Sequence, residues 1–276
     1  MEAEAEKRKN LLSKAKAAME SECYDQMVHF MKEAVESIKN GLNEEERRLL
    51  WTAYLKSMDA RLASWQNEMS RSHVEVDPQQ LEAVKHKLYT IESEIVSMCS
   101  EFHVLIDKHF IVDDNSVEED VIAYLLKGDL DRYVAEVRPD DSRKFAAACE
   151  AHLSYLVATT IANEPGTDVS DSTRRWLDKN FSILKTEFFS TEVAKKDFRE
   201  YILKWCETEM EVYEGNEREL YNLQKSKIKR KLYRAMVLKA ILDEDVLVPV
   251  PVPVTVPDSM AELGEMKKEG QPHGHP

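Results

Sequence analysis

The sequence predicts an all-α protein on the strength of three observations. Glycine and proline, the residues that most often interrupt helices, number only 7 and 9 in 276 residues. Strong helix formers (Glu, Lys, Ala and Leu) are abundant, and apolar residues recur at helical spacing. No alternating strand pattern extends beyond a few residues. We therefore expect about nine helices, joined by short loops that make neighbouring helices antiparallel.

Caps and breakers divide the first half of the chain into five helices. Asn40-Gly41 ends one helix, and Asn43 then supplies an N-cap that is followed by three glutamates in the first turn. Asp77-Pro78 opens another helix, because proline suits the first helical position. The predicted helices cover residues 7–20, 24–39, 43–72, 78–109 and 117–137.

The second half of the chain continues in the same way. Asp140 precedes an Ala-rich helix, which ends where Asn163-Glu164-Pro165-Gly166 forms a turn. Gly215 separates two later helices. The predicted helices cover residues 143–163, 171–189, 191–213 and 217–242.

The C-terminal segment differs from the helical body. Residues 246–257 alternate valine with proline, so this stretch is expected to be extended, near polyproline II, rather than helical. Residues 258–276 have the composition of a disordered segment. We therefore expect one helical domain over residues 1–245 and a separate tail over residues 246–276.

Charge and composition exclude several classes of protein. A net charge of −14 would repel the phosphate backbone of nucleic acid. No apolar run approaches the roughly 20 residues that a membrane span needs, so we expect no membrane span. The N-terminus is acidic and has no apolar core, unlike a signal peptide. Four dispersed cysteines without a CxxC pair fit reduced thiols in a cytoplasmic protein: Cys23, Cys99, Cys149 and Cys206.

The sequence contains none of the common catalytic or cofactor motifs. We find no P-loop, HExxH, GxSxG or dinucleotide-binding glycines. His103 and His109 lie six residues apart, which is not the spacing of two ligands on one helix face. His273 and His275 in the tail would bind a metal weakly or not at all. We therefore expect no enzyme activity, no cofactor and no structural metal.

Four motifs occur in a fixed order along the chain. Residues 122–137 read Ile-Ala-Tyr-Leu-Leu-Lys-Gly-Asp-Leu-Asp-Arg-Tyr-Val-Ala-Glu-Val, and further motifs lie in residues 14–27, 42–65 and 180–187. Together they resemble the 14-3-3 family, dimeric all-helical adaptors that grip phosphoserine or phosphothreonine peptides. The resemblance covers roughly residues 9–243, and it implies a concave groove and a role in signal transduction by protein binding.

The resemblance implies a phosphate site that is only partly retained. Arg132 and Tyr133 match the Arg-Tyr pair that touches the phosphate in the family. Three other cations of the family are replaced here, by Leu55, Leu62 and Leu125. Convergent cations suit a phosphate group, which carries nearly two negative charges. Weak binding of ordinary phosphopeptides is therefore expected.

Other residues complete the implied phosphopeptide site. Lys56 lies one residue from the lost lysine, and Arg61 matches a neighbouring arginine that helps to position the site. Asn180 matches a residue that clamps the ligand backbone, and Ile183 matches the apolar groove wall. Lys127 and Glu187 belong to the matching motifs.

Each of these residues also has an ordinary structural interpretation. Arg132 could form a salt bridge with Glu187 or Asp129, and Tyr133 could be a core tyrosine. The last predicted helix could supply replacement cations, or its basic residues could form a solvated face: Lys225, Lys227, Lys229, Arg230, Lys231 and Arg234.

The resemblance also bears on partners. Phosphorylated client proteins are the expected ligands; the alternative is a helical scaffold that has lost its dependence on phosphate. Thr255-Val256-Pro257 fits the family's phospho-Thr-x-Pro core, so the tail could occupy its own groove or remain disordered. A homodimer is expected although family ion-pair residues are replaced by Cys23, Gln26 and Thr90, with Glu94 retained.

Overall fold

The computed structural model describes residues 2–36, 42–75, 77–112 and 115–201, and within these ranges it confirms the all-α prediction. It contains seven complete helices and the start of an eighth at residue 192. The ninth predicted helix and the tail, including Thr255, lie outside the described residues. The helices are α1 (Glu2–Glu20), α2 (Tyr24–Glu36), α3 (Glu44–Val74), α4 (Pro78–His109), α5 (Val117–Val137), α6 (Asp141–Ala162) and α7 (Asp171–Phe188).

Side-chain caps set the beginnings of the helices. The Asn43 side chain accepts a hydrogen bond from the Glu46 amide, and the Glu46 carboxylate accepts one from the Asn43 amide. Ser116 and Glu119 form the same reciprocal pair at the start of α5. These capping boxes satisfy amide groups that a helix leaves unpaired in its first turn, so the predicted starts of α3 and α5 agree with the structure. Helix α1 begins at Glu2, before the predicted start at residue 7.

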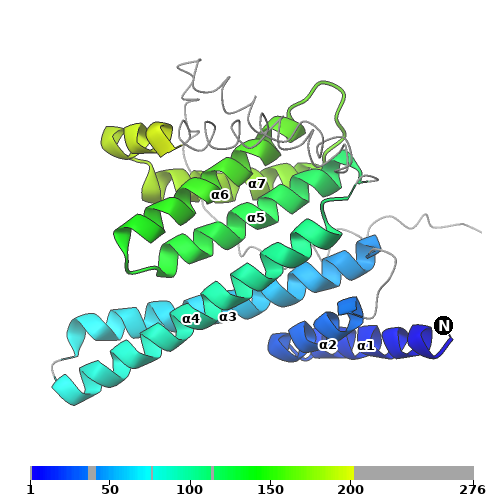
Figure 1. Ribbon diagram of the computed structural model, residues 1–276, viewed down its shortest axis with the longest axis horizontal. Coiled ribbons are helices and arrows are strands. Elements are labelled where there is room, and N and C mark those ends of the chain that lie inside the picture. The colour runs from blue at the N-terminus through cyan, green and yellow to red at the C-terminus, as the bar shows by residue number, and fades with distance from the viewer. Residues whose placement is uncertain (1, 37–41, 76, 113–114, 202–276) are drawn as a thin grey trace, which may run out of the picture.

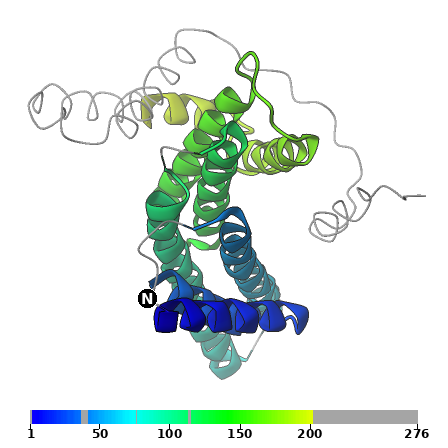
Figure 2. The same ribbon diagram turned by 90° about the vertical axis from the view of Figure 1, so that its right-hand side faces the viewer.

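The helices form a curved array in which sequence neighbours pack together (Figures 1 and 2). The pairs α1–α2, α3–α4 and α5–α6 are in contact, and α5 also packs against α4 and α7. In Figure 2, α1 and α2 lie at one end of the array, and α6 and α7 lie at the other.

Helix α5 is buried on most of its circumference and contributes to two apolar cores. One core joins α5 to α1–α4 and includes Leu126 and Leu130. The other joins α5 to α6 and α7 and includes Leu125 and Tyr155. A Cβ atom placed on Gly128 would lie 2.5 Å from the Tyr155 ring, so glycine is what allows α5 and α6 to approach this closely.

Helix α6 is the most apolar long helix among the described residues that could be tested for a membrane span. By length and composition alone it could cross a membrane, so the prediction that no stretch approaches this limit is wrong. Half of its most apolar window is buried inside the protein. Its side chains pack against α5 and α7, and the core helix of a soluble protein passes the same test.

Candidate functional site

Arg132 of α5 lies at the centre of the candidate site. Its side chain is only 11% exposed, and its guanidinium pairs with Glu136 one turn later at 3.6 Å. The guanidinium also lies over the Tyr133 ring, 4.9 Å from the centroid. Burial lowers the pKa of Arg132, but Tyr155 and Asp129 outweigh that effect and raise the pKa above its ordinary value. Arg132 is therefore a permanent cation that is held by its own helix.

Tyr133 reaches across to α3 rather than standing free. Its hydroxyl donates a hydrogen bond to the Asp59 carboxylate at 2.7 Å, and the residue is 7% exposed. Burial and the nearby Asp59 charge raise the pKa of Tyr133 well above its usual range. The hydroxyl consequently remains protonated and acts as a hydrogen-bond donor. The acceptor of that hydrogen bond is the Asp59 carboxylate.

Asp129 lies on the buried side of the group of side chains around Arg132 (the Arg132 cluster). It accepts hydrogen bonds from the Tyr155 hydroxyl and from the Asn180 side-chain amide, the latter at 2.7 Å. Burial raises the pKa of Asp129, and the charge of Arg132 opposes this shift. Asn180, the predicted clamp for a ligand backbone, therefore uses its amide NH₂ to hold Asp129, and its side-chain oxygen is left as an acceptor.

Further charges surround Arg132 on the more exposed side. Burial and the Glu136 charge raise the pKa of Glu187, whereas Arg132 and Lys144 lower it, so these four groups influence one another. The Gln66 side chain of α3 donates to the Glu136 carboxylate at 2.8 Å. The structure thus brings carboxylates as well as cations together around Arg132, the residue that the resemblance assigns to phosphate binding.

Leucines occupy apolar positions where the resemblance implied cations. Leu55 is 4% exposed and belongs to the core shared by α1–α5, and Leu62 packs against that core. Leu125 is fully buried in the core of α5, α6 and α7. These three residues contribute packing and no positive charge.

Several predicted site residues lie away from the Arg132 cluster or take no part in it. The Arg61 guanidinium binds Asp25 at 2.7 Å and Glu94 at 2.9 Å, which ties α3 to α2 and α4. Lys127 pairs with Asp107 of α4 at 2.9 Å. Lys56 forms no ion pair among the described residues, and Ile183 is half-buried on α7.

The salt-bridge interpretation of Arg132 was correct in kind but named other partners. The ion-pair partner is Glu136, and Asp129 and Glu187 act on Arg132 or its neighbours through their charges. No motif in the sequence singles out Asp59 or Glu136 as a site residue. A signal for Asp59 did exist, since positions 55, 59 and 62 are spaced to share one face of a helix.

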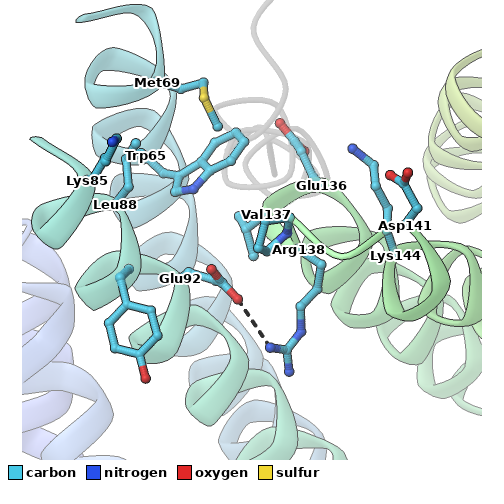
Figure 3. A pocket seen from close by; sticks show the side chains of 12 residues that line it. Trp65, Met69, Lys85, Leu88, Glu92, Glu136, Val137, Arg138, Asp141 and Lys144 are labelled. Carbon is cyan, nitrogen blue, oxygen red and sulfur yellow. Dashed lines mark hydrogen bonds and ion pairs between the residues drawn. The ribbon is translucent and has the colours of Figure 1, made fainter. Parts of the chain in front are cut away.

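An apolar pocket of about 390 Å³ opens beside the cluster and shares Glu136 and Lys144 with it. Figure 3 shows Trp65 and Met69 of α3 on one side and Lys144 on the other, with Val137 between them. Arg138 crosses to Glu92 of α4 at 3.1 Å. The pocket combines an apolar wall with a charged rim.

The described residues define an all-helical protein whose curved array of helices carries a charged cluster beside an apolar pocket. Comparison with known proteins specifies the class further. The family model for the 14-3-3 protein matches residues 14–227. The chain belongs to the 14-3-3 family.

Several curated relatives are similar over most of their length. The chain is 32% identical to 14-3-3 protein 9 of Solanum lycopersicum over 212 residues, which cover 72% of this chain and 78% of that protein. It is 32% identical to 14-3-3-like protein GF14 epsilon of Arabidopsis thaliana over 228 residues, covering 78% and 86%. It is 35% identical to 14-3-3 protein epsilon of Drosophila melanogaster over 187 residues, covering 67% and 70%.

Family membership supports the function of a phosphopeptide-binding adaptor, and nothing in the described residues indicates catalysis.

Proposed function

We propose that this chain is a phosphoserine- or phosphothreonine-peptide-binding adaptor whose phosphate site is weakened and which regulates client proteins by binding them in its groove. The observation that carries the proposal is the state of Arg132, which is buried, held by Glu136 and unaccompanied by cations at positions 55 and 62. In this proposal Arg132 and Tyr133 contact the phosphate.

The remaining predicted residues take supporting roles in the proposed site. Asn180 offers its side-chain oxygen to the ligand backbone, and Ile183 contributes an apolar wall. Glu187 and Lys56 set the local charge. Lys127 and Arg61 act indirectly, because their ion pairs fix α5 and α3 against neighbouring helices. The pocket that Trp65 and Met69 line would receive an apolar ligand side chain.

The missing cations give the expected size of the weakening. Each hydrogen bond to a charged group contributes roughly 1.5–3 kcal/mol. The absence of two such contacts corresponds to a loss of affinity of about a hundredfold or more. The chain should accordingly prefer a phosphorylated peptide only modestly over its unphosphorylated form.

Fluorescence polarisation tests this function directly. A labelled phosphoserine peptide and its unphosphorylated twin are titrated with the full chain and with Arg132→Gln. We expect a weak preference of the natural chain for the phosphorylated form, and loss of that preference in Arg132→Gln. Glu45→Gln serves as the control, since Glu45 is an exposed residue at the far end of α3.

A second function is favoured by the carboxylates beside Arg132. Glu136 and Glu187 compete with a phosphate for the guanidinium, which suits a scaffold that binds unmodified partners. Equal affinity for the two peptides would identify this scaffold function and reject the weakened phosphate reader.

The assembly and location of the protein are proposed from its family. We infer a soluble, cytoplasmic homodimer with one helical domain over residues 1–245 and a tail over residues 246–276. Phosphorylation at Thr255 would let the tail compete for the groove. Deleting residues 246–276 should then raise the affinity for an added phosphopeptide, and an unchanged affinity would reject self-binding.

A further inference from the structure

Asp59 contacts Tyr133 but has no role in the proposed function. It is a half-buried carboxylate on α3, and its Oδ1 atom accepts a hydrogen bond from the Tyr133 hydroxyl at 2.7 Å. Among the described residues it has no cationic partner, and Lys56, one turn earlier on α3, does not pair with it. The Asp59 carboxylate is thus held beside the Tyr133 hydroxyl by one hydrogen bond.

Among the described residues, no cation forms an ion pair with Asp59. Positions 55, 59 and 62 share one face of α3, and the two flanking positions carry leucine. The nearest arginine in sequence, Arg61, turns to Asp25 and Glu94 instead. A phosphate that approached Tyr133 would therefore meet a carboxylate, and it would have to displace that carboxylate from the hydroxyl.

We propose that Asp59 is a specificity-determining residue that occupies the Tyr133 hydroxyl and thereby suppresses recognition of phosphate in this groove. The inference rests on the proposed function, in which Arg132 and Tyr133 contact the phosphate. Two effects act together: Asp59 repels the incoming dianion, and it withholds a donor that the phosphate oxygen needs.

Two variants separate these effects. Asp59→Asn removes the charge but keeps an oxygen that can accept the Tyr133 proton, whereas Asp59→Ala removes both and suits a helix. We expect phosphopeptide affinity to rise about tenfold in Asp59→Ala and less in Asp59→Asn, as when a charged acceptor stops competing for a donor. Affinity for the unphosphorylated twin should not change.

Two controls exclude trivial causes of the gain. Glu45→Gln on the same helix removes one negative charge far from Tyr133 and should leave both affinities as they are. In the Asp59→Ala background, Tyr133→Phe should abolish most of the gain, because the hydroxyl would no longer be present to be released. Circular dichroism confirms that each variant keeps its helical content.

The outcomes distinguish this inference from the proposed function. If the natural chain prefers the phosphopeptide and Asp59→Ala shows no gain, the role of Asp59 is rejected and the weakened reader stands. If the natural chain shows no preference and Asp59→Ala acquires one, the role of Asp59 is supported and the natural chain is not a phosphate reader. If neither protein shows a preference, both ideas are rejected.

Discussion

At the scale of single residues, the site shows how hydrogen bonds decide what a retained motif can do. Arg132 and Tyr133 are present, but each is engaged with an acid of its own chain, Glu136 and Asp59. A charged side chain that is paired inside the protein has less to offer a ligand, since binding must first break the internal contact. The identity of these two residues is therefore insufficient to predict their function.

His152 provides a test of burial at the residue scale. Its ring lies among Phe181, Phe189 and Phe198, and its buried Nδ1 atom has no hydrogen-bond partner within the part of the chain that the structure describes. Burial, with a smaller effect from the Lys185 charge, lowers the pKa of His152 to about 3. Below about pH 6.5, His152 therefore binds a proton in the unfolded chain but stays neutral in the folded chain.

This difference predicts a loss of stability in acid. The free energy of unfolding contributed by His152 is fully present above the unfolded pKa, and it falls by about 1.4 kcal/mol per pH unit below it, or about 2 kcal/mol at pH 5. Urea unfolding at several pH values measures this dependence. His152→Phe should flatten the profile and the exposed control His73→Gln should not; identical slopes for His152→Phe and the natural chain would contradict the assignment.

At the scale of helices, α5 and α6 are held at close range by one small residue. The Tyr155 ring lies directly over Gly128, and its hydroxyl donates to Asp129, the residue that follows Gly128. A side chain at position 128 would separate the helices and pull Tyr155 from Asp129. The packing of two helices thus controls the support beneath Arg132.

We expect Gly128→Ala to destabilise the protein by about 1–3 kcal/mol despite the better helix propensity of alanine, because the added carbon overpacks the contact. Chemical denaturation of Gly128→Ala, Tyr155→Leu and the double variant measures the coupling. The double variant should lose less than the sum of the two single changes, since leucine leaves room for the methyl group. Simple additivity would show that the ring is not the obstacle.

The helices themselves were largely predictable from sequence, and the contacts between them were not. Caps such as Asn43 and Ser116 are local signals, so the starts of α3 and α5 could be placed to within a residue or two. The bond between Tyr133 and Asp59 joins residues 74 positions apart, and no local pattern reports it. The same holds for Arg61, whose direction depends on where α2 and α4 lie.

At the scale of the whole molecule, the proposed homodimer would need an unusual set of contacts. The retained acid Glu94 already binds Arg61 of its own chain, and Cys23 and Gln26 carry no charge. An interface without ion pairs depends on apolar contact. Added salt weakens interactions between exposed charges but affects apolar contacts far less.

Sedimentation velocity at rising salt concentration tests this arrangement. We expect a particle of twice the 31.9 kDa chain mass, with a dissociation constant that changes little with added salt. A steep salt dependence would indicate intersubunit ion pairs after all, and a monomer at micromolar concentration would reject the dimer.

The membership of α5 in both apolar cores has a consequence for how this chain's lineage could change. Substitutions on the buried faces of α5 would disturb α1–α4 or α6 and α7 at once, so packing alone constrains most of residues 117–137. Half-exposed positions on α3, such as Asp59 and Leu62, carry less of this constraint. Packing can consequently preserve the signature sequence of α5 even where residues on a neighbouring helix that would contact a ligand have changed.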